Sequence, residues 1–188
     1  TYDLLSELDP DRTSKRGAEQ LRRHFHVGES GPLVVVAHKP HADFLSADGV
    51  QGLRDLTSSL YLDGVTAVRS LVSPIGKRSK RGAMSLLGHN HRLTQEVYLG
   101  QSERPGDVTR LELVLEHDPF SIEAIQVLQK VDDYLEDLSQ SDSYWAGSRF
   151  LFSGTTAGIR DLREVTSADN IRIQTLVVLA VLTILFIF

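Results

Sequence analysis

The sequence predicts an α+β domain in which two helices cover one face of a four-stranded antiparallel sheet. Four short segments rich in Val, Leu and Phe indicate strands, and an amphipathic helical pattern follows the first and the third of them. Hydrophobic residues make up 41% of the chain and charged residues 24%, which is typical of a folded globular body. The apolar run 176–188 departs from this composition and indicates a membrane segment after the domain.

Residues 1–28 are expected to form an N-terminal linker helix that precedes the domain. Thr13 or Ser14 is suited to cap this helix, because a side-chain hydroxyl accepts a hydrogen bond from an unpaired backbone N–H. Residues at helical spacing then form its apolar face: Ala18, Leu21 and Phe25. We expect the domain itself to occupy residues 29–154.

The first half of the domain has the order strand, helix, strand. The continuous apolar run Leu33–Ala37 predicts a strand that is buried on both faces. A helix is expected to open at Ser46 and to end at Asp63-Gly64, because glycine accepts the left-handed conformation that closes many helices. Its apolar face contains Val50, Leu53, Leu56 and Leu60. The second strand is predicted over Val65–Leu71.

A long insertion is predicted over 73–107, with a short helix near His89–Tyr98, because Pro, Gly and polar residues interrupt the pattern there. It contains a basic cluster formed by Lys77, Arg78, Lys80 and Arg81. A solvated loop explains this cluster most simply. The functional alternative is contact with the headgroups of anionic lipids, which attract basic side chains near the membrane surface.

The second half repeats the order strand, helix, strand. Leucines alternate with other residues in Arg110–Glu116, which predicts a half-buried strand. Asp118 as cap and Pro119 at the first helical position predict the start of a long helix. Apolar residues recur along that helix: Ile122, Ile125, Leu128, Val131, Leu135 and Leu138. With a fourth strand over Arg149–Ser153, the order becomes the βαββαβ of a ferredoxin-like fold, with both helices on one face.

Small residues after the fourth strand predict a junction over 155–170 between the domain and a final helix over 171–188. The residues that we interpret as a hinge allow close backbone approach: Gly154, Thr155, Thr156 and Gly158. Thr166 or Ser167 is predicted to cap the final helix. Asp169 would then lie in its first turn, where the helix dipole favours a negative charge.

The apolar run Leu176–Phe188 contains one polar residue, Thr183, and no charge. It is shorter than the ~20 residues of a spanning helix, so a buried core helix is an alternative. A truncated transmembrane helix is favoured because the run has no polar face. The chain begins at Thr1 without Met or a signal peptide, and we expect both ends to lie inside a longer protein.

The residue types do not indicate an enzyme, and we expect no catalytic residue, metal or cofactor. The absence of Cys excludes disulfide scaffolds, Cys-based zinc sites and Cys nucleophiles. Two HxH pairs, at His24/His26 and His89/His91, have no further metal ligand nearby in the sequence, so surface histidines are the simpler interpretation. The single Trp145 favours packing in the core or between domains over a lipid-facing cleft. The net charge of −5 argues against a nucleic-acid partner.

Segments spread over nearly the whole chain carry a family resemblance. They are Tyr2–Leu5, Ser14–Phe25, Gly28–Pro32, Gly64–Pro74 (GVTAVRSLVSP), Leu113–Ile125 (LVLEHDPFSIEAI) and Phe152–Leu162 (FSGTTAGIRDL), followed by Asp169. The last segment is the most specific, because a strand, a glycine, hydroxyl residues and a short helix precede the apolar run. On these segments the chain resembles the MMPL (mycobacterial membrane protein large) branch of the resistance-nodulation-division (RND) transporters.

The resemblance implies a porter domain between the first and second membrane helices of a proton-driven exporter of lipids or other hydrophobic molecules. Such a domain lies on the extracytoplasmic side of the bacterial cytoplasmic membrane. Its implied partners are a second porter domain and the membrane helices of the same full-length chain, and the oligomeric state stays open. In this family later membrane helices carry the proton-coupling residues, so Asp169 is not expected to carry protons. The alternatives are a membrane-anchored sensor or binding ectodomain without transport activity and, least favoured, a membrane-tethered hydrolase.

Overall fold

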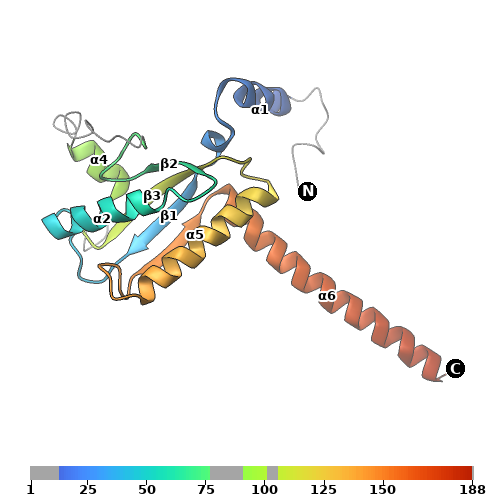
Figure 1. Ribbon diagram of the computed structural model, residues 1–188. Helices are drawn as coiled ribbons and strands as arrows, with labels where there is room; N and C mark the ends of the chain where they lie inside the picture. Colours follow the sequence, from blue (N-terminus) through green and yellow to red (C-terminus); the bar gives the residue numbers. More distant parts are fainter. Residues whose placement is uncertain (1–12, 77–90, 101–105, 188) are drawn as a thin grey trace.

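The computed structural model describes residues 13–76, 91–100 and 106–187, and these residues form a mixed α+β domain followed by a long helix (Figure 1). The elements run in the order α1 (Thr13–His24), η1 (Val27–Ser30), β1 (Leu33–His38), α2 (Ala47–Ser59), β2 (Val65–Arg69), α4 (His91–Tyr98), β3 (Val108–Leu115), α5 (Ile122–Gln140), β4 (Arg149–Ser153) and α6 (Thr155–Ile187). The predicted α+β class is confirmed.

The four strands form one antiparallel sheet in the order β2-β3-β1-β4. β1 lies inside the sheet and pairs with β3 on one side, from Leu33 opposite Leu113 to His38 opposite Val108. On its other side it pairs with β4, where Val35 lies opposite Phe152. The predicted four-stranded antiparallel sheet is therefore confirmed, and its centre is the first strand of the chain.

One face of the sheet packs against α2 and α5 and holds the core (Figure 1). Alternate residues of the central strands are buried on this face: Leu33, Val35, Ala37, Leu111, Leu113 and Leu115. The alternation predicted for the third strand holds as far as Leu113, but Val114 is buried on the opposite face, where the prediction left it exposed. The prediction that the first strand is buried on both faces is wrong, because Val34 and Val36 point to the opposite face and stay partly exposed.

Two helix boundaries differ from the predictions because neighbouring side chains and turns compete with the helix. Ser46 caps α2 as predicted, with its Oγ accepting a hydrogen bond from Gly49 N at 3.1 Å. However, α2 ends at Ser59, and Gly64 (φ +90°) forms the turn into β2. The predicted Asp118 cap of α5 is also wrong: its carboxylate accepts from Phe120 N at 3.0 Å, and Ser121 caps the helix by accepting from Ala124 N.

The predicted insertion 73–107 contains the short helix α4, and β3 begins directly after it at Val108. The basic cluster Lys77, Arg78, Lys80 and Arg81 lies outside the described residues, so its contact with lipid headgroups stays a prediction. The predicted linker helix over residues 1–28 corresponds to α1 in its described part.

Shortening a side chain should reduce the stability of the domain much more on the buried face of the sheet than on the exposed face. Leu113→Ala should lower the free energy of unfolding by about 2–5 kcal/mol, because it opens a cavity at a fully buried position. Leu151→Ala, on β4 with 62% of the side chain exposed, is the matched control and should change it by less than about 0.5 kcal/mol. Denaturant unfolding followed by the fluorescence of the buried Trp145 measures both. Equal losses would contradict the one-sided core.

Candidate functional site

The sheet passes into α6 through a turn that only glycine fits. Gly154 has φ +112°, a left-handed conformation that other residues rarely adopt. A Cβ at this position would lie 2.8 Å from the carbonyl oxygen of Pro32, just before β1. The Gly154 carbonyl accepts the first helical hydrogen bond, from Gly158 N at 3.0 Å. The helix therefore begins directly where the strand ends, with its direction set by this turn.

The first turns of α6 pack against the domain. Thr156 and Ala157 are 0% and 3% exposed, and Ile159 is buried as well. The Thr156 hydroxyl has no hydrogen-bond partner among the described residues, and burying such a group costs about 1–3 kcal/mol. Thr155 is partly buried, and its Oγ1 lies close to the backbone of Gly31. These residues fix the first turns of α6, residues 155–160, to the domain, and we call these turns the root of the helix.

Arg160 joins three elements at this root. Its Nη1 donates a hydrogen bond to the Asp132 carboxylate on α5 at 2.8 Å. Its guanidinium carbon lies 5.6 Å from the centre of the Phe152 ring on β4. The sequence does not predict this contact, because the two partners are 28 positions apart and no local spacing pairs them.

The predicted junction residues do not form a break in the chain. α6 runs from Thr155 to Ile187 as one helix, so the predicted cap at Thr166 or Ser167 is wrong, and the proposed boundary at residue 170 is not a helix end. Neither Gly nor Pro follows Gly158, so nothing in the sequence interrupts the helix. A hinge within 155–170 stays a prediction. The backbone of that segment is helical throughout, and the non-helical residue at the junction is Gly154, directly before it.

Asp169 lies in the interior of α6, not in a first turn as predicted. Its carboxylate is 3.5 Å from Arg172 Nη1, and both side chains are exposed. The helix dipole acts only near a helix end, so it does not explain this carboxylate. Gly158, by contrast, lies early in α6 and has open space where a side chain would be.

Beyond its root, α6 extends away from the domain (Figure 1). It is the one helix among the described residues that is long and apolar enough to cross a membrane, and none of its most apolar stretch is buried. The side chains of Leu176 and Leu185 are 66% and 72% exposed. The alternative of a buried core helix is therefore wrong for this run.

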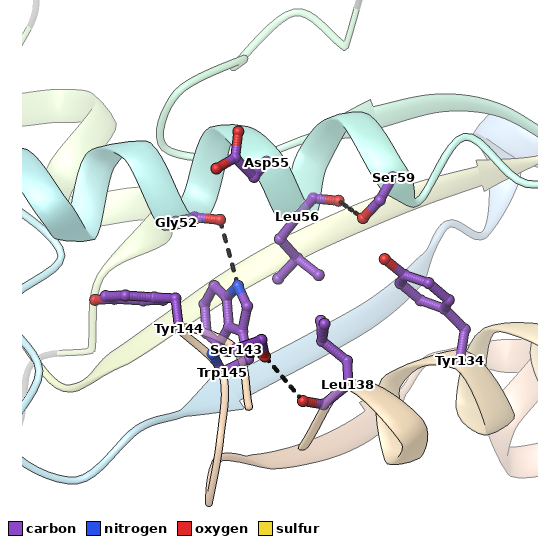
Figure 2. A pocket seen from close by; sticks show the side chains of 9 residues that line it. All are labelled: Gly52, Asp55, Leu56, Ser59, Tyr134, Leu138, Ser143, Tyr144 and Trp145. Atoms are coloured by element: carbon purple, nitrogen blue, oxygen red, sulfur yellow. Dashed lines mark hydrogen bonds between the residues drawn. The ribbon is translucent and has the colours of Figure 1, made fainter. Parts of the chain in front are cut away.

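A groove of about 220 Å³ lies between α2 and α5, on the helical layer of the domain (Figure 2). Leu56, Leu138 and Trp145 form its apolar part, with Asp55 on α2 and Tyr134 on α5 at its sides. Trp145 is 3% exposed and stacks on Phe44 at 5.6 Å. The prediction that this tryptophan packs in the core is confirmed, but one side of it also lines the groove.

Tyr144 lies at one end of the groove, against Gly52, where a Cβ on α2 would collide with its ring. Burial raises the pKa of the Tyr144 phenol, and the negative charges of Asp48 and Asp43 raise it further. The Lys39 ammonium lies 5.1 Å from the centre of the same ring. A cation thus already occupies one aromatic face beside the groove.

The face of the sheet opposite the helices carries a charged network. Glu29 Oε2 accepts a hydrogen bond from Arg69 Nη2 at 2.5 Å, and this bond raises the pKa of the Arg69 guanidinium. On the adjacent strand β3, Arg110 donates a hydrogen bond to Glu112 at 2.8 Å. The Arg69–Glu29 pair attaches η1 to β2, and the Arg110–Glu112 pair stays within β3.

The described histidines are not gathered into a metal site. His24 and His26 are exposed near the end of α1, and His38 Nε2 lies 3.8 Å from Asp107 Oδ2. No group of three or more His, Asp or Glu side chains able to hold a metal occurs among the described residues. His89 and the side chain of His91 lie outside that part of the chain.

No family model matches this chain, and no curated protein matches it. Its functional interpretation therefore depends on two features of the structure, the root of α6 and the groove between α2 and α5.

The two glycines at the root predict stability changes of opposite sign. Gly154→Ala should destabilise the domain by about 1–3 kcal/mol, because alanine is strained at φ +112° and its Cβ meets Pro32. Gly158→Ala should stabilise it by up to about 1 kcal/mol, because alanine favours helix and the site has open space. Denaturant unfolding of both variants measures this, and a stabilising Gly154→Ala would contradict the strained turn.

Proposed function

We propose that this chain is the porter domain of a proton-driven exporter of the MMPL branch of the RND superfamily, which moves lipids or other hydrophobic molecules. One observation carries the proposal: a helix long and apolar enough to cross a membrane continues without a break from the sheet of a folded domain. Phe152–Leu162, the most specific of the segments that resemble the family, lies at this root. The domain would stand on the extracytoplasmic side of the bacterial cytoplasmic membrane.

The strand order supports the ferredoxin-like part of the proposal. In βαββαβ domains of this type, the first and third strands are central neighbours, and each half contributes one helix to the same face. Here the order is β2-β3-β1-β4, and α2 and α5 follow β1 and β3. Porter subdomains of the family have this topology.

The contacts at the root of α6 support a specific way in which movement of the membrane part of this helix would be transmitted to the domain. Arg160 ties α6 to α5, and Gly154 ties it to the start of β1. A rotation or shift of the membrane part of α6 would therefore move the sheet and α5 together as a rigid body. Such movements against the second porter domain of the same chain would open and close a path for a hydrophobic substrate.

The same helix is compatible with a second function, a membrane-anchored sensor or binding ectodomain without transport activity. One apolar helix among the described residues is all that an anchor requires. The two functions differ in what surrounds this segment in the gene. A transporter has a span before residue 1, about five spans after residue 188 and a second copy of this pattern, whereas a sensor has one span followed by a cytoplasmic domain.

The decisive experiment follows from that difference. The hydropathy of the complete gene product distinguishes the two architectures. Efflux of a fluorescent lipid from proteoliposomes, driven by a proton gradient, then tests transport by the intact protein. A single span with a soluble domain, or efflux indifferent to the gradient, would overturn the proposal.

Breaking α6 between its root and its apolar run should uncouple the domain from the membrane. Asn170 is exposed in this stretch, and Asn170→Pro should kink the helix at a cost of about 3 kcal/mol while leaving the domain folded. Proton-driven efflux by the intact protein should fall by more than half, with unchanged Trp145 fluorescence. The control Asn170→Ala keeps the helix and should transport normally; full efflux by the proline variant would contradict rigid coupling.

A further inference from the structure

The groove between α2 and α5 has no part in the proposed coupling through α6, yet it is shaped to hold a ligand. An enclosed apolar cavity of about 150 Å³ holds benzene, and the groove has room for a ring at about 220 Å³, although it is open to solvent on one side. Leu56 and Leu138 face each other across it, and Trp145 closes one side (Figure 2). A single aromatic ring or a short alkyl chain fits a space of this kind.

Three polar groups in the wall, those of Ser59, Ser143 and Trp145, have partners within the domain. Ser59 Oγ donates to Leu56 O at 3.0 Å, and Ser143 Oγ donates to Leu138 O at 3.1 Å (Figure 2). The Trp145 indole N–H donates to Gly52 O at 3.3 Å. These groups therefore present little polarity to the groove, and its interior favours an apolar group.

Carboxylates outnumber cations around the groove, because Asp55, Asp48 and Asp43 lie at or near it and Lys39 lies at its Tyr144 end. Asp55 is the one charged residue that lines it in the described part of the chain, and its exposed carboxylate accepts a hydrogen bond from the neutral Gln51 amide at 2.8 Å. α5 carries five acidic residues and one lysine, and that lysine, Lys130, lies 3.4 Å from Asp63. Asp48 and Asp43 lie close enough to act on Tyr144 at the end of the groove. No basic side chain pairs with Asp55 among the described residues, so a cation is the complementary charge.

Aromatic rings and a carboxylate line the same groove, and each of these groups attracts an ammonium ion. The ring quadrupole attracts cations, and recognition of ammonium ligands by aromatic side chains uses this attraction. The Lys39 ammonium, 5.1 Å from the centre of the Tyr144 ring, shows a cation in such a place at the edge of this same groove.

We propose that the groove binds a small amphiphilic amine, with its ammonium group beside Asp55 and its ring or alkyl chain against Leu56, Leu138 and Trp145. This site is independent of the proposed transport. It requires only the folded domain, and its ligand approaches from the exposed side of the helical layer.

Three ligands of nearly equal size test the charge preference: 2-phenylethylammonium, 2-phenylethanol and 3-phenylpropanoate. The full chain is kept in a neutral detergent, and the indole N–H resonance of Trp145 reports binding without ambiguity because the chain has one tryptophan. The ammonium ligand should bind about two- to fivefold more tightly than the alcohol, the range expected for an exposed ion pair. The carboxylate should bind most weakly.

Two variants test whether the preference for the ammonium ligand comes from the groove. Because each ligand partitions into the detergent equally with every variant, a difference between the variants reports binding to the protein. Asp55→Asn should reduce the affinity for the ammonium ligand to that for the alcohol. Asp133→Asn changes an exposed carboxylate on α5 that does not line the groove, and it should retain the preference.

Three results would overturn the proposal. The first is a Trp145 resonance that does not respond to the ammonium ligand. The second is equal affinity of the wild type for all three ligands, which would show that charge plays no part in binding. The third is an equal loss in both variants, which would show general attraction to an acidic surface.

Discussion

The close approach of two backbones, where β4 ends beside the entry to β1, determines how the rest of the molecule is arranged. Gly154 turns the chain in a left-handed conformation and lies where any side chain would meet the Pro32 carbonyl. Because β1 pairs with both β3 and β4, this contact relates the direction of α6 to the centre of the sheet. Arg160 on Asp132 adds a second point of attachment between α6 and the domain. In the proposed coupling, these two contacts make the domain and the helix move together.

The sheet divides its two faces between different kinds of interaction. One face excludes water with leucines and valines under α2 and α5, so that its stability comes from apolar burial. The opposite face uses partly exposed ion pairs, such as Arg69 with Glu29, which are individually weak and hold η1 in register. The helical layer contains the groove, because Leu56 and Leu138 do not fill the space between two helices that both pack on the sheet.

The sequence predicts most of what depends on local pattern and little of what depends on distant contact. The Ser46 cap, most of the alternation in β3 and the middle of the α5 stripe depend on neighbouring residues, so local pattern suffices for them. The start of the stripe is wrong, because Ile122 is exposed and Ala124 and Val127 are buried instead. The sequence does not locate the start of α5, because Asp118 and Ser121 are both suitable cap residues. In the folded chain the Asp118 carboxylate accepts from Phe120 N in a turn, and Ser121 caps the helix. The sequence suggests two segments where α6 is one helix, because Thr166 and Ser167 are residue types that cap helices. No Gly or Pro near them ends the preceding helix. The Arg160–Asp132 pair and the groove join residues far apart in the chain, and no spacing rule finds them.

The continuity of α6 also has a geometric consequence. At about 1.5 Å per residue, its 33 residues form a rod of roughly 50 Å. Helices in bilayers occupy tilts from 0 to about 40°. A change of about 10° in the tilt of such a rod sweeps its far end through roughly 9 Å, several times the displacement of residues near the pivot. In the proposed transporter, a small change of tilt inside the membrane would therefore displace the domain by several ångströms, because the contacts of Gly154 and Arg160 attach the helix to the domain.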